Sequence, residues 1–169
     1  MKTKKLLLAA ILILTSINSV KAQEVIISKN SIFIELLGNG GAFSFNYERS
    51  FKPKLNGRIG FCSFKSIDLL DPENKDRITT IPVMITYFTG QKGSHFEIGG
   101  GMLFGTINED IGLSAIIDLT AFLGYRYHAP GNGMLIRIGL TPFLALDNKA
   151  NYPDKGLFLS GGLSLGYHF

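Results

Sequence analysis

The chain has 169 residues, with 17 lysines and arginines against 13 acidic residues and a formal net charge of +4. Four of the lysines lie within residues 1–22, so the other 147 residues carry 13 basic and 13 acidic side chains, a length that predicts one domain. Without a net positive charge this part lacks the electrostatic attraction that holds a polyanion, and we expect no nucleic-acid partner.

Residues 1–22 have the pattern of a cleavable secretory signal peptide. Three lysines precede an apolar run over 6–14, and a small residue, Ala22, ends the stretch. The run is shorter than the roughly 20 apolar residues that a membrane-spanning helix needs. The sequence therefore predicts a leader over 1–22 and an exported domain over 23–169.

After residue 30, segments in which apolar and polar residues alternate recur between stretches rich in Gly, Pro, Asn and Asp. A period of two is typical of β-strands that have one apolar face, whereas helical periodicity is nearly absent here. We expect eight strands, over 31–38, 42–51, 55–64, 79–89, 95–105, 113–128, 134–146 and 157–169.

The predicted connections between these segments alternate in length. The second, fourth and sixth are short, whereas the third (66–76), the fifth (108–112) and the seventh (147–155) are longer. Short periplasmic turns and longer external loops are typical of outer-membrane barrels. The first connection, over 38–41, is unexpectedly short for an external loop.

The alternation also indicates which face of the sheet is apolar. Along 42–51, Phe45 and Tyr47 alternate with Asn46 and Glu48, and the same phase carried around the sheet gathers ionised side chains on one face. A barrel in lipid is apolar outside and can be polar inside, the reverse of a soluble barrel. An eight-stranded barrel is just wide enough to be filled by side chains, so we expect these charges to pair and close the lumen. The predicted lumen charges are Glu35, Glu48, Glu97 and Asp118 with Arg58, Arg126 and Arg137.

Aromatic residues, prolines and glycines give three further expectations. Tyr and Phe gather near the periplasmic ends of the outward-facing columns, as in the aromatic girdles of membrane barrels. Pro82 and Pro142 each remove a backbone donor inside a strand, so we expect bulges or local breaks there. The glycines of the inner face are expected to leave room for the long arginine side chains.

The leader, the alternating segments and the final Leu165-Gly166-Tyr167-His168-Phe169 together resemble a known family. They are similar to the small eight-stranded outer-membrane β-barrel proteins of Gram-negative bacteria, the OmpA-like and OmpX-like group. The resemblance implies an all-β, closed, antiparallel transmembrane barrel in the cell outer membrane, surrounded by outer-membrane lipid. It also implies that Tyr167 and Phe169 belong to the signal that the barrel-assembly machinery recognises. It brings no catalytic residues and no cofactor.

Such a barrel is expected to have a structural, adhesive or surface-binding role with a side-chain-filled lumen. One alternative is a soluble, lipocalin-like periplasmic carrier, which would enclose an apolar ligand in an apolar lumen. Another is a lipid-modifying outer-membrane enzyme, which would use a Ser or His of the barrel wall. No Ser, His and acidic residue fall together on the predicted outer face, so we expect no catalytic residues and no enzyme.

Three smaller features have residue types that occur in binding sites. His95, His128 and His168 fall at the predicted periplasmic rim and would bind a metal only if they converged, but no metal-ligand spacing supports this and no metal ligand is predicted. The acidic stretch over 66–76 matches no calcium-loop pattern and is interpreted as a solvated loop. Cys62 faces inward in the predicted register and is interpreted as an inert, packed thiol.

Overall fold

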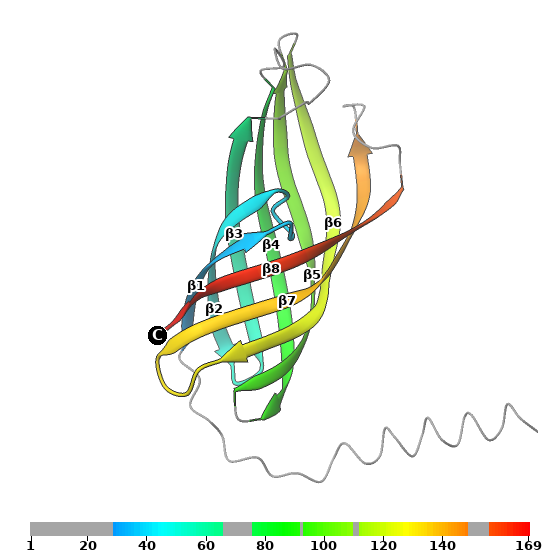
Figure 1. Ribbon diagram of the computed structural model, residues 1–169. Coiled ribbons are helices and arrows are strands. Elements are labelled where there is room, and N and C mark those ends of the chain that lie inside the picture. Colours follow the sequence, from blue (N-terminus) through cyan, green and yellow to red (C-terminus); the bar gives the residue numbers. More distant parts are fainter. Residues whose placement is uncertain (1–28, 66–75, 92, 110–111, 149–155) are drawn as a thin grey trace, which may run out of the picture.

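The computed structural model describes residues 29–65, 76–91, 93–109, 112–148 and 156–169. Eight antiparallel strands pair in chain order and close into one barrel, which confirms the predicted fold (Figure 1). Over these ranges no helix is long and apolar enough to span a membrane. The strands are β1 (Asn30–Leu36), β2 (Phe43–Lys52), β3 (Leu55–Lys65), β4 (Arg77–Gln91), β5 (Ser94–Glu109), β6 (Gly112–His128), β7 (Gly133–Asn148) and β8 (Leu157–His168).

The predicted strands coincide with the observed ones to within a few residues, with one error in the connections. The expected long fifth connection is wrong, because β5 continues to Glu109 and β6 begins at Gly112. The third and seventh connections, over 66–76 and 149–156, are long as expected. The leader over 1–22 and the acidic stretch over 66–75 lie outside the described residues.

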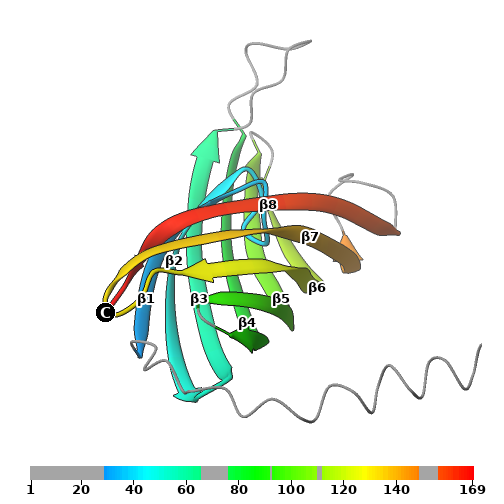
Figure 2. The same ribbon diagram turned by 60° about the horizontal axis from the view of Figure 1, so that its bottom comes forward.

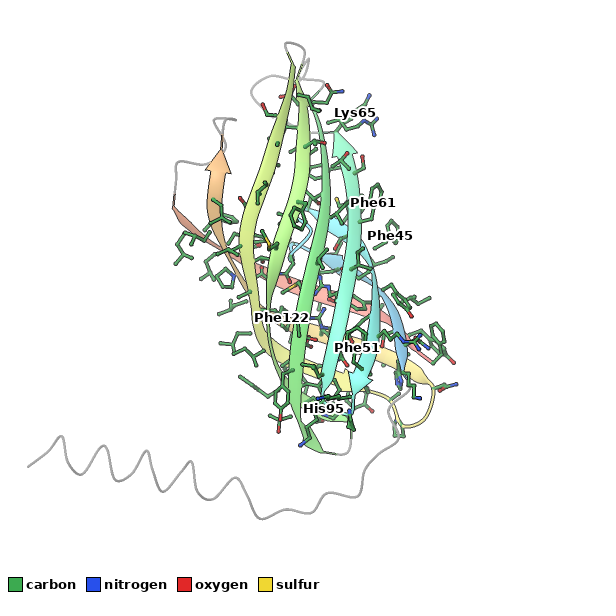
Figure 3. All side chains as sticks on the ribbon, turned by 180° about the vertical axis from the view of Figure 1, so that it is seen from behind. Phe45, Phe51, Phe61, Lys65, His95 and Phe122 are labelled. Carbon is green, nitrogen blue, oxygen red and sulfur yellow. The ribbon has the colours of Figure 1, made fainter. Side chains whose placement is uncertain are left out.

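The outer surface of the barrel is apolar and its inner surface is polar. On β2, Phe45 is 58% exposed, whereas the adjacent Asn46 is 5% exposed and Glu48 is 2% exposed. Figure 3 shows Phe45 and Phe61 pointing away from the barrel, and Phe122 lies inside it. An apolar outside around a charged inside suits a lipid surround and is the reverse of what a soluble carrier requires. The barrel is therefore built to span a bilayer.

The barrel wall has unequal height at the end that carries the long connections. β4, β5, β6 and β7 have 15 to 17 residues, whereas β1 has 7 and β2 has 10. In Figure 1 the β1–β2 hairpin accordingly ends well below the tips of β4, β5 and β6, and Figure 2 shows β1 beside β8 in a turned view. β1 pairs with β8 only as far as Leu36 opposite Leu163, so 157–162 of β8 extends beyond β1. The barrel wall at the external end is therefore shorter on the side of β1 and β2, hereafter the low side.

The two prolines inside strands produce local breaks, as predicted. The ladder between β3 and β4 skips the residue pairs beside Pro82 and resumes in the same register. The ladder between β6 and β7 is interrupted beside Pro142 in the same way. Each proline keeps its cross-strand partner on the other side, Leu103 for Pro82 and Leu159 for Pro142. Each proline therefore interrupts the pairing with one neighbouring strand over a few residues, and the barrel stays closed.

Candidate functional site

Three arginines and three glutamates meet inside the barrel. They come from six different strands, and each is at most 2% exposed. The strand alternation that puts the apolar residues outside turns all six inward. Their formal charges cancel, as the burial of several ions in one lumen requires. These residues, hereafter the charge network, are Glu35, Glu48, Glu97, Arg58, Arg126 and Arg137.

Arg126 joins two of the carboxylates. Its Nη1 and Nη2 donate to Oε1 and Oε2 of Glu48 at 2.6 and 2.7 Å, a bidentate pair. Its Nε lies 2.8 Å from Oε2 of Glu97. Glu48 also accepts a hydrogen bond of 3.2 Å from Nδ2 of Asn56. Arg126 therefore connects β2 to β5 across the lumen.

The network continues from Glu97 to the other two arginines. Arg137 donates to Glu97 from Nε at 3.0 Å and from Nη2 at 2.8 Å, and its Nη1 lies 3.5 Å from Oε1 of Glu35. Glu35 in turn forms a buried ion pair with Arg58. Charges of opposite sign thus alternate without a gap from Glu48 to Arg58. Such a chain leaves none of the six ions without a partner.

Aromatic rings support the arginines from the sides. The guanidinium carbon of Arg137 lies 4.3 Å from the ring centre of Phe122 and 4.9 Å from that of Phe33, distances that allow cation–π attraction. A Cβ atom on Gly124 or Gly139 would come within 2.8 or 2.7 Å of Phe122 Cζ. The space left by these glycines therefore holds the Phe122 ring, and Arg137 packs on that ring. The expectation that glycines make room for arginine directly is corrected accordingly.

The short connection between β1 and β2 folds into the lumen and closes the network from the external side. Asn39 is completely buried, and its backbone N–H donates to Glu35 at 3.0 Å. Its Nδ2 donates to Thr120 on the opposite wall at 2.5 Å. Thr80 donates to the carbonyl of Gly40 at 2.6 Å. The connection over 37–42, hereafter the cap, explains why the sequence offers so short a first external loop.

Asp118 does not join the network, which corrects the prediction. It has the inward phase of β6 but is only partly buried, and its Oδ1 has no hydrogen-bond partner among the described residues. Asp118 lies on the external side of Thr120, the residue that holds the cap through Asn39. The cap therefore separates its carboxylate from the arginines. The predicted set of four acids is reduced to three in the structure.

The three histidines predicted at the periplasmic rim converge inside that end of the barrel. The ring centres of His128 and His168 are 4.8 Å apart, and those of His95 and His128 are 5.5 Å apart. Phe88 packs beside them, with its ring centre 4.9 Å from that of His95. In the described part of the chain no three His, Cys, Asp or Glu side chains are placed to hold a metal ion. Convergence alone therefore does not create a metal site.

Tyr167 and Phe169, the predicted assembly signal, lie on the outer surface. They are 49% and 45% exposed, and their rings stack with centres 6.4 Å apart. The final residue is tied to the first strand, because the N–H of Asn30 donates to the carbonyl oxygen of Phe169 at 3.0 Å. Recognition of these rings by the assembly machinery stays a prediction.

Three asparagines of the site were missed in the sequence, and one of them is Asn56, which donates to Glu48. Asn46 accepts a hydrogen bond of 2.9 Å from Nε of Arg58, and Asn39 anchors the cap. Asn46 shares the inward phase of Glu48, so the alternation already carried the signal that it faces the arginines. Asn39 lies between glycines in a stretch with ordinary turn composition, and nothing in that local pattern distinguishes an inward cap from an external turn.

Comparisons with known proteins identify the fold. No protein-family model matches the chain, and no curated protein matches its sequence. The structure is similar to the N-terminal β-barrel domain of Pseudomonas aeruginosa OprF, with a TM-score of 0.60 and 16% identity over 84% of this chain and 99% of that one. It is also similar to Neisserial surface protein A (NspA), with a TM-score of 0.54 and 17% identity over 83% and 92%. The chain therefore has the eight-stranded barrel fold of these two proteins, with an apolar exterior and an ionised lumen.

Proposed function

We propose that this outer-membrane barrel is a closed, non-conducting and non-enzymatic support with a structural, adhesive or binding role at the cell surface. The observation that carries the proposal is the charge network. Its six ionised side chains alternate in sign across the lumen, and all are at most 2% exposed. An ion could cross this layer only by separating buried pairs. Removing one partner of a buried pair typically costs about 3–5 kcal/mol, which opposes spontaneous opening.

The cap adds a second closing layer. Asn39 is bonded both to the network at Glu35 and to the far wall at Thr120, and Gly40 is bonded to Thr80. A pore would require the cap to leave these partners as well as the separation of the arginines. Both layers favour a support over a channel.

The low side of the external end supports a role in surface binding. Phe158 has the inward phase of β8, yet it is 54% exposed because β1 does not extend opposite it. Its ring centre lies 6.2 Å from that of Phe143, which is nearly buried. An exposed aromatic residue backed by a buried one is a favourable contact for an apolar group of a partner. The proposed contact therefore lies at Phe158.

Planar-bilayer recordings test the closed lumen. We expect no current from the wild-type protein and none from Arg137→Ala, because Arg126, Arg58 and the cap still cross the lumen. Heat-modifiable gel migration must show that both proteins are folded. An Asp118→Asn barrel, altered on the inner face outside the network, serves as the matched control. Sustained single-channel currents from the wild-type protein would contradict the proposal.

Cells of a Gram-negative host that carry the wild-type barrel, Phe158→Ser or an empty vector test the surface role. We expect the wild-type barrel to increase adhesion to polystyrene and to protein-coated glass, and Phe158→Ser to remove most of that gain. Phe61→Leu, on the lipid-facing side, should adhere like the wild type. Survival in detergent measures a structural role separately. The surface role fails if the wild type equals the vector in adhesion, and the structural role fails if the two are equal in detergent survival.

A further inference from the structure

A groove runs along the outside of β1. The outward side chains of this strand, Ile32 and Ile34, are smaller than the aromatic residues beside them. Ile32 pairs with Tyr47 on β2 and with Tyr167 on β8, and Ile34 pairs with Phe45. This groove is part of a shallow outer hollow of about 800 Å³ that also extends over Ile59 and Phe61 of β3. A branched aliphatic floor between aromatic walls gives an apolar track on the lipid-facing surface.

The periplasmic end of this groove is polar and positively charged. The hydroxyl of Tyr47 donates to Asn30 at 2.8 Å, which marks the end of the apolar track. Arg49 pairs with Asn30 on the same outer face, and Lys29 directly precedes Asn30; both cationic side chains are exposed. The backbone of Phe169 lies beside them, because its carbonyl oxygen accepts the N–H of Asn30. No acidic side chain is present in 29–31 or in 49–54, so the charged side chains along these two segments are all positive.

The surrounding turn adds further positive charge. Lys52 and Lys54 flank Pro53 between β2 and β3, and both lysines are exposed. Over the described residues of the three periplasmic turns, no acidic side chain is present to offset them. The described acidic side chains of this half of the barrel are the buried ones of the charge network. The exposed charge beside the groove is thus positive.

We propose that this groove binds an anionic glycerophospholipid of the periplasmic leaflet, with one acyl chain along Ile32 and Ile34 and the phosphate at Lys29 and Arg49. The proposal rests on the membrane location that the proposed function assumes. β1 has 7 residues, or about 23 Å at 3.3 Å per residue, whereas the hydrocarbon of one leaflet is about 15 Å thick. An acyl chain therefore fits along the strand while its headgroup stays at the interface. Arg49 supplies a planar fork that suits phosphate.

Native mass spectrometry of the folded barrel in detergent tests the proposal, with phosphatidylglycerol and phosphatidylcholine of identical acyl chains as probes. We expect the wild-type barrel to prefer phosphatidylglycerol. In the Lys29→Gln/Arg49→Gln double variant, binding of phosphatidylglycerol should fall roughly tenfold or more, since each cation at a membrane surface contributes about a factor of five. Lys65→Gln removes an exposed charge from the outer face at the opposite end and should bind like the wild type.

A second variant separates the groove from the charge. Ile32→Trp leaves both cations in place but fills the space between Tyr47 and Tyr167, and we expect it to weaken binding of both lipids. The proposal is overturned if the wild-type barrel shows no preference for phosphatidylglycerol, or if the double variant and Lys65→Gln bind it equally. It is also overturned if Ile32→Trp binds like the wild type. Partition into detergent and heat-modifiable migration report the membrane barrel itself, so its failure would be seen separately.

Discussion

The lumen contains two buried polar clusters that differ in how their groups are partnered. In the charge network every ion has a charged partner. Glu97, for example, accepts hydrogen bonds from Nε and Nη2 of Arg137 and also contacts Arg126. In the histidine cluster at the periplasmic end, neither ring nitrogen of His95 or His128 has a hydrogen-bond partner among the described residues. Both clusters are almost fully buried. Burial alone therefore does not tell how strongly a polar residue holds this barrel together.

The energetic difference follows from charge and from partners. Removing one side of a buried ion pair leaves an uncompensated ion, which typically costs about 3–5 kcal/mol. A neutral imidazole without a partner has already lost its hydrogen bonds to water, which costs about 1–3 kcal/mol in the native barrel. Replacing such a ring with an apolar ring of similar shape removes that cost. Substitutions of the network ions and of the two histidines without partners, His95 and His128, should therefore act in opposite directions.

Glu97→Gln should have the largest effect. After this substitution Glu48 is the one carboxylate of the network in contact with Arg126, and Glu35, at 3.5 Å, is the one in contact with Arg137. We expect a loss of about 3–5 kcal/mol in the free energy of unfolding. Urea titration in detergent micelles, followed by heat-modifiable gel migration, measures it.

Asp118→Asn is the matched control for that experiment, since it makes the same acid-to-amide change on the same inner face. Asp118 forms no ion pair with the described residues, so we expect a change below about 1 kcal/mol. Equal losses in the two variants would show that the paired geometry contributes nothing beyond burial of a carboxylate.

Phe122→Ala should have the next largest effect. Phe122 is 1% exposed, fills the space beside Gly124 and Gly139, and lies under the guanidinium of Arg137. Removal of a buried aromatic ring typically costs about 3 kcal/mol or more. The same urea titration measures it, with the lipid-facing Phe104→Ala as the control that should lose less. A Phe122→Ala barrel as stable as the wild type would indicate that the arginines hold their positions without the ring.

The sequence predicted the faces of the strands well because alternation is a local property. Phe45 and Tyr47 had to point away from Asn46 and Glu48 whatever the rest of the chain did. The grouping of six charges followed from carrying that phase around a closed barrel. The position of Asp118 relative to the arginines could not be predicted, because it depends on the cap, which is held by contacts with Glu35, Thr120 and Thr80 on three different strands.

Asn39→Ala tests the cap, with an intermediate effect. The substitution removes the hydrogen bonds from Nδ2 to Thr120 and to the carbonyl of Ala121, and the long one of 3.5 Å that Oδ1 accepts from Arg58. The backbone bond to Glu35 can persist. Three lost hydrogen bonds, one of them long, predict a loss of about 2 kcal/mol. Hydrogen exchange at the amides of 37–42 should also become faster. Asn108→Ala, an exposed residue near the end of β5, is the control and should leave both measurements unchanged.

His128→Phe should have the smallest effect and the opposite sign. The ring of His128 packs edge-on against Phe88 with 5.9 Å between centres, and a phenyl ring preserves that contact. We expect the variant to be equally stable or more stable by up to about 1 kcal/mol. His168→Phe, by contrast, loses the contact of 2.9 Å between Nε2 and the carbonyl of Ala129 and should be less stable by about 1 kcal/mol. Thermal unfolding of the two variants in the same detergent separates these cases. If His128→Phe lost as much stability as Glu97→Gln, partnering would not distinguish the two clusters, and burial of any polar side chain in this lumen would have to be the stabilising feature.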